Sequence, residues 1–229
     1  MVIIMLGAPG TGKGTVGHML SDKLGIVHIS SGEIFRSYIK KHDYIGKQIQ
    51  SYVQQGNLVP DELSFRLVGM RLLEPDTLNG LILDGFPRTD KQAIELDTLL
   101  NIIGKKVSVA VNLSLPDEEI ISRIVSRRTC PNPDCREIYN LQFKPPKVEG
   151  ICDKCGSTLI LREDDNEETV RQRLDTYHEL SEDLINYYKN KDILYTVKMN
   201  EQSYNTTDKI AEEIEAYLAK RGEKVNGNN

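Results

Sequence analysis

A glycine-rich stretch near the start of the chain, residues 7–15, constrains the fold more than any other feature. The four apolar residues before it, 3–6, have the composition of a short buried strand. Glycine permits positive φ, so successive N–H groups can point toward one anion. A helical pattern begins near Lys13, and a helix N-terminus favours negative charge. The sequence therefore predicts a strand, a phosphate-binding loop and a helix in series, with an ordinary glycine-rich turn as the alternative.

The spacing within this stretch is Gly-x-x-x-x-Gly-Lys, which is the pattern of a P-loop. Lys13 would supply a mobile positive charge for the outer phosphates. Most such loops carry Ser or Thr directly after the lysine as a magnesium ligand, whereas this chain has Gly14 and then Thr15. The candidate phosphate-binding residues are Gly10, Thr11, Gly12, Lys13, Gly14 and Thr15.

Composition narrows the classes of function that remain. The chain has 229 residues, a net charge of -5 and no basic run, which argues against a general nucleic-acid or membrane-surface role. No apolar stretch approaches the length of a transmembrane helix, and the N-terminus lacks the pattern of a signal peptide. We therefore expect a cytoplasmic protein whose cysteines remain reduced.

Helical and strand-like segments alternate along the chain without a tandem repeat. Helices are expected at 13–24, twice within 33–55, and at 61–73, 89–103, 116–128, 167–189 and 207–220. Strands are expected at 27–29, 80–84, 107–113 and 193–197, with short strand-like pieces at 137–139 and 158–161. This order predicts an α/β fold with a doubly wound parallel sheet. Two insertions interrupt it, a helical one at about 31–60 and a cysteine-bearing one at about 129–163.

Asp84 ends an apolar strand, where a carboxylate is costly unless it has a function. In P-loop proteins the terminal Asp of a second strand faces the phosphate loop and binds magnesium, usually through water. The alternative is a turn or cap residue before Gly85.

Six arginines fall near predicted strand or insertion boundaries: Arg36, Arg88, Arg123, Arg127, Arg162 and Arg173. Bringing two anionic nucleotides together requires several guanidinium groups, although any one of these residues could simply be solvated. Helical spacing places Arg173 beside the buried stripe of its helix and Arg171 away from it.

All four cysteines lie in the second insertion, as Cys130-x4-Cys135 and Cys152-x2-Cys155. Two close pairs joined by a short loop predict a four-sulfur zinc site. Four thiolates fill a tetrahedral site, so the metal would be structural and would supply folding energy to a small insertion. Four unliganded thiols are the alternative. The four histidines lie on separate predicted elements with no evident acid partner, and we assign them no catalytic role.

These motifs resemble the adenylate kinase family, part of the nucleoside monophosphate kinases, in its long-lid, zinc-containing form. The resemblance runs from Val2 to about Ala219. It rests on Gly7-Ala8-Pro9-Gly10-Thr11-Gly12-Lys13-Gly14-Thr15, Ile29-Ser30-Ser31-Gly32, Leu83-Asp84-Gly85-Phe86-Pro87-Arg88-Thr89, Arg162-Glu163-Asp164-Asp165-Asn166 and Arg171-Gln172-Arg173-Leu174. The family shares the Lys-Gly-Thr variant of the loop, which accounts for Gly14.

The resemblance implies reversible, magnesium-dependent transfer of a phosphoryl group from ATP to AMP, which gives two ADP and balances the adenine nucleotides. It implies a core of residues 1–29, 60–126 and 165–229, a mononucleotide-binding domain of 30–59 and a lid of 127–164. A monomer is expected on the same grounds, with no nucleic-acid or membrane partner. The implied ATP-binding residues are Gly10 to Thr15, Arg123, Arg127, Ile138, Tyr139 and Gln202.

The implied AMP-binding residues are Ser31, Arg36, Asn57, Leu58, Val59, Gly85, Phe86, Pro87, Arg88, Gln92, Arg162 and Arg173. The implied catalytic residues are Lys13, Asp84, Arg88, Arg127, Arg162 and Arg173, with Asp84 holding magnesium through water. Gln92 could instead complete a helix capping box begun by Thr89.

Three positions depart from the family pattern. Ser31 replaces the usual threonine, the first cysteine pair is wider than usual, and the familiar glycine near Gln202 is absent. Two other functions remain open. One is phosphoryl transfer to another acceptor such as UMP or CMP, and the other is a zinc-ribbon module that contacts nucleic acid and uses ATP only as a ligand.

Overall fold

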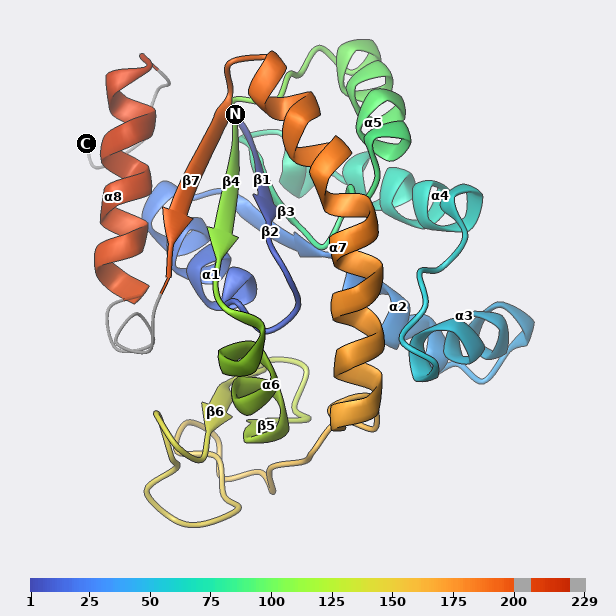
Figure 1. Cartoon of the computed structure of the whole chain (residues 1–229), viewed down its shortest axis with the longest axis vertical. Helices are drawn as coiled ribbons and strands as arrows, with labels where there is room; N and C mark the ends of the chain where they lie inside the picture. Colours follow the sequence, from blue (N-terminus) through green and yellow to red (C-terminus); the bar gives the residue numbers. More distant parts are fainter. Residues whose placement is uncertain (200–206, 223–229) are drawn as a thin grey trace.

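The computed structural model describes residues 1–199 and 207–222. At its centre lies a five-stranded parallel sheet with the order β2-β3-β1-β4-β7 (Figure 1). The strands are β1 (Val2–Leu6), β2 (Val27–Ser30), β3 (Leu81–Asp84), β4 (Val109–Ser114) and β7 (Leu194–Lys198). This sheet confirms the expected α/β class, and strand β1 with its glycine-rich loop lies in the middle of it.

Helices cover both faces of the sheet, because alternate residues of each buried strand point to opposite sides. Ile3 and Met5 pack into a core with α1 and α8, whereas Val2, Ile4 and Leu6 pack into a second core with α4 and α5. The helices are α1 (Lys13–Leu24), α2 (Ser31–Ile39), α3 (Tyr44–Gln54), α4 (Asp61–Leu72), α5 (Asp90–Ile102), α6 (Asp117–Val125), α7 (Glu167–Asn190) and α8 (Thr207–Lys220). Helix α7 contributes side chains to both cores. No described helix is both long and apolar enough to cross a bilayer.

Strand register brings the candidate phosphate loop and Asp84 to the same edge of the sheet. Met5 pairs with Asp84 on β3, and Leu6 pairs with Asn112 on β4. The loop that follows Leu6 therefore begins beside the end of β3. In open parallel sheets this carboxyl edge is where ligands bind.

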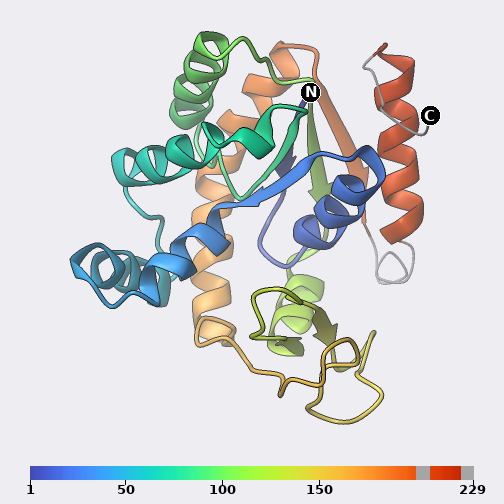
Figure 2. The same cartoon turned by 180° about the vertical axis from the view of Figure 1, so that it is seen from behind.

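Two segments extend beyond this edge, as the sequence predicts. Helices α2 and α3 form the first, and their small apolar cluster of Phe35 and Ile49 also includes Leu67 of α4. The second carries the four cysteines and contains β5 (Arg127–Thr129) paired antiparallel with β6 (Ile138–Asn140). The two segments leave the sheet in different directions with the first half of α7 between them (Figures 1 and 2).

The structure corrects some predicted boundaries. Helix α6 ends at Val125 instead of continuing to residue 128, because Arg127 to Thr129 pair with β6. Helix α2 begins two residues earlier than predicted, because the Ser30 side chain caps it by accepting a hydrogen bond from Glu33 N. Residues 158–161 form only isolated bridges, and a short 3₁₀ helix at Pro75–Thr77 was not expected.

Candidate functional site

The glycine-rich loop has the conformation that its sequence predicts. Gly7, Gly10 and Gly12 all have positive φ, and Gly12 is the N-cap of α1 with φ 96°. A Cβ at Gly7 would lie 2.3 Å from the carbonyl oxygen of Leu113, so only glycine fits there. The Lys13 ammonium donates to the carbonyl of Ala8 at 2.7 Å, which folds the lysine back over the loop. The loop therefore presents a helix N-terminus and one cation to the same space.

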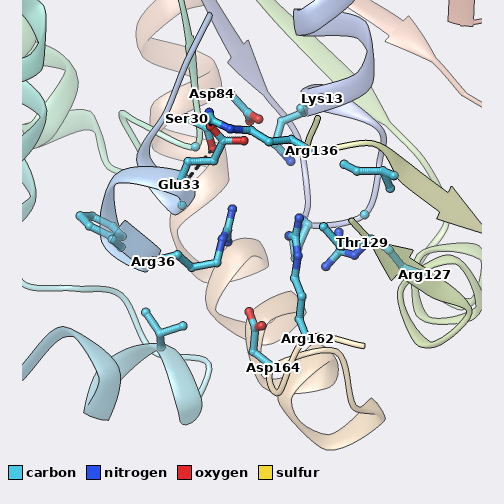
Figure 3. A pocket seen from close by; sticks show the side chains of 18 of the residues that line it. Lys13, Ser30, Glu33, Arg36, Asp84, Arg127, Thr129, Arg136, Arg162 and Asp164 are labelled. Atoms are coloured by element: carbon cyan, nitrogen blue, oxygen red, sulfur yellow. Dashed lines mark hydrogen bonds and ion pairs between the residues drawn. The ribbon is translucent and has the colours of Figure 1, made fainter. Parts of the chain in front are cut away.

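A cleft of about 680 Å³ lies between the loop, helix α2 and the cysteine-bearing segment (Figure 3). It brings together most of the residues that the sequence singles out. These are Gly10, Gly12, Lys13, Gly14, Thr15, Arg36, Asn57, Leu58, Val59, Asp84, Gly85, Phe86, Arg88, Gln92, Arg123, Arg127, Ile138, Tyr139, Arg162 and Arg173. One cavity thus gathers side chains from segments more than 150 residues apart in the sequence.

Three predicted residues lie elsewhere in the described structure. Thr11 is fully buried, with its hydroxyl donating to Ala8 O. Ser31 is buried beside Gly85, where a Cβ would lie 2.7 Å from Ser31 Oγ. Pro87 lines a separate hollow of about 90 Å³ behind the loop. Gln202 lies outside the described residues.

Arginines from three different segments point into the cleft (Figure 3). Arg36 comes from α2, Arg127 from β5, and Arg162 from the chain that leads to α7. Arg127 Nε donates to Asp165 Oδ2 at 2.8 Å, and this carboxylate side chain is fully buried. Within residues 1–199 and 207–222, Arg36 and Arg162 make no ion pair of their own. These two guanidinium groups therefore remain available for an anion.

Burial disfavours the charged form of the free cations in the cleft. Burial, together with the neighbouring Arg127 and Arg36, lowers the pKa of Arg162 to about 9. Burial likewise lowers the pKa of Lys13 to about 8, against the raising effect of Asp84. The pKa of Arg36 is also lowered, again chiefly by burial. A phosphate chain would relieve this electrostatic cost, because an anion stabilises each charged form.

Arg173 and Arg171 on α7 confirm the orientation that helical spacing predicts. Arg173 lines the cleft and binds Asp164, and its side chain is 17% exposed. Arg171 is 52% exposed and pairs with Glu167 one turn earlier. Gln92 does not complete a capping box, because its Oε1 accepts from Arg88 N and its Nε2 donates to Asp61.

The acidic partners of two cleft arginines were not predicted from the sequence. Asp164 and Asp165 lie in a motif that the sequence singles out, but nothing in their spacing identifies Arg173 and Arg127 as their partners. Arg136, in the cysteine-bearing segment, donates to Glu33 on α2 at 2.6 Å and so bridges the cleft (Figure 3). Two histidines also have acid partners that we did not expect. His178 Nε2 lies 2.8 Å from Asp117 Oδ2, and His28 Nε2 lies 3.8 Å from Asp84 Oδ2.

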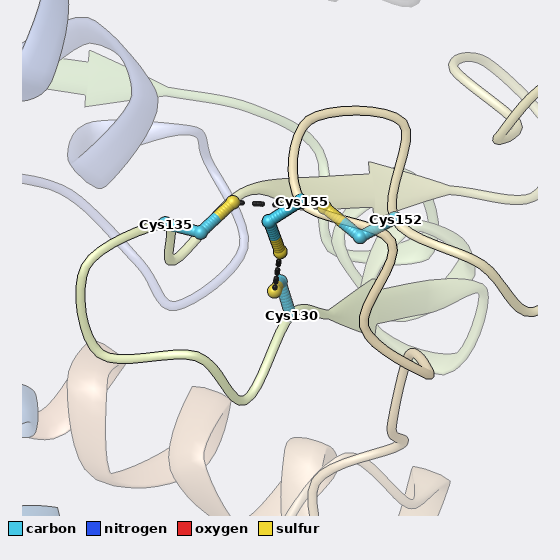
Figure 4. A group of neighbouring side chains, drawn as sticks. All are labelled: Cys130, Cys135, Cys152 and Cys155. Atoms are coloured by element: carbon cyan, nitrogen blue, oxygen red, sulfur yellow. Dashed lines mark hydrogen bonds between the residues drawn. The ribbon is translucent and has the colours of Figure 1, made fainter.

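The four cysteines form a compact cluster (Figure 4). Their sulfur atoms all lie within 4.8 Å of one another, with Cys130 to Cys155 at 3.4 Å and Cys135 to Cys152 at 3.6 Å. A tetrahedral Zn–S₄ site with bonds of about 2.3 Å places sulfurs about 3.8 Å apart. Hydrogen bonds from Ser157 lower the pKa of Cys155 to about 6, which favours the thiolate that a metal needs. The cluster thus has the donor set and spacing of a metal site.

The fold and the cleft together define a class. A parallel sheet with a P-loop after β1, a carboxylate at the end of the neighbouring strand and two segments carrying arginines is the arrangement of a P-loop phosphotransferase. The family model for adenylate kinase matches residues 5–193. The chain therefore belongs to the adenylate kinase family.

Curated adenylate kinases are similar in sequence to this chain along most of its length. The adenylate kinase of Lachnospira eligens is 50% identical over 197 residues, which cover 86% of this chain and 92% of the relative. The adenylate kinase of Caldicellulosiruptor saccharolyticus is 45% identical over 210 residues, which cover 92% of this chain and 97% of the relative. The adenylate kinase of Archaeoglobus fulgidus is 44% identical over 220 residues, which cover 96% of this chain and 99% of the relative.

The lowered pKa of Lys13 predicts a specific pH dependence. The free protein should lose the Lys13 charge above about pH 8. We therefore expect kcat/KM for ATP to fall roughly tenfold per pH unit above that value. The kcat should stay level to higher pH, because bound phosphates raise the lysine pKa again. Initial rates between pH 6.5 and 10 test this expectation, and a level kcat/KM across that range would contradict it.

Proposed function

We propose that the chain transfers the terminal phosphoryl group of MgATP to AMP, reversibly, and gives two ADP. The observation that supports this most strongly is a pair of guanidinium groups, Arg36 and Arg162. They make no ion pair among the described residues and face the P-loop cation Lys13 across one cleft. A simple nucleotide hydrolase needs cations for one phosphate chain. This cleft has enough cations for two phosphate chains, and they come from opposite sides of it.

The donor side of this proposed site is the loop. Residues 10–15 would bind the ATP phosphates through backbone N–H groups and the Lys13 ammonium. Arg123, Ile138 and Tyr139 would border its base and ribose. The Tyr139 side chain is buried with its hydroxyl toward the sulfur of Cys152, so its backbone would face the nucleotide. Gln202 stays a prediction for the same side.

The acceptor side would be formed by α2 and the segments that follow it. Asn57, Leu58 and Val59 line the cleft together with Gly85 and Phe86. Arg36 and Arg88 would bind the AMP phosphate, and Arg162 and Arg173 would lie between the two phosphate chains. Ser31 and Gln92 would contribute to recognition of the base. Gly85 approaches Ser31 closely, and Pro87 would contribute to the same turn, in which it follows Phe86.

Asp84 fits the requirements for holding magnesium. Its side chain is 13% exposed at the cleft, and within the described chain its one ion-pair contact is with His28. A hard carboxylate oxygen left free of arginine is suited to the water shell of Mg²⁺. Magnesium bound there with ATP would supply charge neutralisation on the phosphate oxygens. Lys13 and the arginines perform the same task from the protein side.

Phosphoryl transfer of this kind needs positioning and charge stabilisation more than a dedicated base. Lys13 would follow the transferred group, while Arg127, Arg162 and Arg173 would stabilise charge on its equatorial oxygens. The proposed lid (127–164) and mononucleotide domain (30–59) would close on the core and exclude water, which prevents hydrolysis. The Arg136–Glu33 contact supports such a closure, because it joins the two segments across the cleft.

We further propose that the cysteine cluster holds a structural zinc ion, that the protein is a monomer, and that it works in the cytoplasm. Cysteines stay reduced in that compartment and can serve as metal ligands. All four positions of a tetrahedral ion would be filled by Cys130, Cys135, Cys152 and Cys155. The ion would therefore fix the lid and take no part in the chemistry.

The acceptor is tested with a coupled assay of ADP production from ATP and each of AMP, CMP, UMP and GMP. The proposal predicts that AMP gives the highest kcat/KM. Faster turnover with UMP or CMP would instead identify a pyrimidine nucleotide kinase. If no monophosphate is phosphorylated but nucleic acid is bound, the zinc-ribbon module is correct.

Removal of the metal should destabilise the lid without removing an active-site ligand. We expect one zinc per chain in freshly purified protein, measured by elemental analysis. Extraction with a chelator should lower the melting temperature by several degrees, because metal binding supplies folding free energy to this small segment. Readdition of zinc is the control and should restore it. Freshly purified protein without zinc would contradict the proposal.

A further inference from the structure

His28 is a buried imidazole that the mechanism above does not use. Its side chain on β2 is only 3% exposed. Neither ring nitrogen has a hydrogen-bond partner among the described residues. Buried polar groups are nearly always paired, so an unpaired one calls for an explanation. His28 also lines the nucleotide cleft.

The position of the ring is fixed by its neighbours. Helix α1 passes so close that a Cβ at Gly17 would lie 2.7 Å from His28 Nε2. On another side the His18 ring lies 4.2 Å away between centroids. The imidazole therefore has little freedom to turn toward solvent. Packing of α1 on β2 holds it over the end of strand β3.

The group that His28 faces is Asp84. Ser30 pairs with Asp84 in the β2–β3 register, and His28 lies two residues earlier on the same face. Its Nε2 consequently lies 3.8 Å from Asp84 Oδ2. That separation becomes a hydrogen bond after a shift of less than 1 Å.

We propose that His28 is a positioning residue, whose Nε2–H holds the Asp84 carboxylate in the orientation that accepts the water shell of nucleotide-bound magnesium. The inference rests on the proposed role of Asp84 in that site. It gives the unpaired imidazole a partner when the nucleotide is bound. Residues that donate hydrogen bonds to metal-binding carboxylates orient those carboxylates, and their removal lowers metal affinity.

The test compares three variants. His28→Leu removes the donor, His28→Gln keeps an amide donor, and His18→Gln is the matched control, because His18 touches His28 but is exposed. Calorimetry measures the Kd of ATP without acceptor, in magnesium-free buffer and in buffer with magnesium. The Kd without magnesium divided by the Kd with magnesium measures how much magnesium strengthens ATP binding. This ratio does not depend on turnover.

We expect His28→Leu to reduce this ratio by roughly tenfold and to raise the Mg²⁺ concentration for half-maximal activity to match. ATP binding without magnesium and the KM for AMP should stay within about twofold of wild type. His28→Gln should recover most of the loss, and His18→Gln should behave as wild type. An unchanged ratio in His28→Leu, or a loss that His28→Gln does not recover, would overturn the proposal.

If His28→Leu does not fold, ¹⁵N NMR of wild-type His28 decides the question. A proton on Nε2 supports the proposal, and a proton on Nδ1 alone overturns it. Both readouts are separate from the proposed reaction. If the wild-type protein fails to phosphorylate AMP, the proposed function fails, whereas ATP binding still tests His28.

Discussion

The burial of several cations in one cleft is the constraint on which the rest of the structure depends. Lys13, Arg36 and Arg162 face one another and make no ion pair within the described part of the chain, and burial lowers the pKa of each. Such an arrangement is costly in the empty protein and favourable once phosphates enter. The site therefore stores an electrostatic preference for an anionic ligand, which is what a phosphotransferase needs at the moment of transfer.

The fold supplies the rigid frame that holds these charges in place. Strand β1 is fully buried between two apolar cores, and its loop is fixed by the close approach of Gly7 to β4. Asp164 and Asp165 bind Arg173 and Arg127, so the chain just before α7 is tied to both α7 and β5. The segments that bring Arg36 and Arg127 each pack around a small separate apolar cluster, the first of which is shared with α4. A rigid central sheet with separate outer segments is the combination that closure of a cleft requires.

Local patterns predicted the parts of the fold that local forces decide. The bounds of α1 and α8 match their predictions, because periodic apolar residues define them and Gly25 ends α1 in a left-handed conformation. Strand β5 was missed, since three residues carry no period and its pairing with β6 is nonlocal. The salt bridge of Arg127 with Asp165 and the approach of His28 to Asp84 also depend on tertiary packing, so spacing alone could not reveal them.

In the proposed reaction, the charge of the P-loop lysine stabilises the transferred phosphoryl group and is not needed to maintain the fold. Lys13 donates only to the carbonyl of Ala8 among the described residues, so its removal leaves the cores intact. The most direct measurement is kcat of Lys13→Ala with saturating nucleotides, beside its denaturant unfolding curve. We expect a loss of roughly 10²- to 10³-fold in kcat, with an unfolding midpoint close to wild type. Near-normal turnover in a folded variant would contradict it.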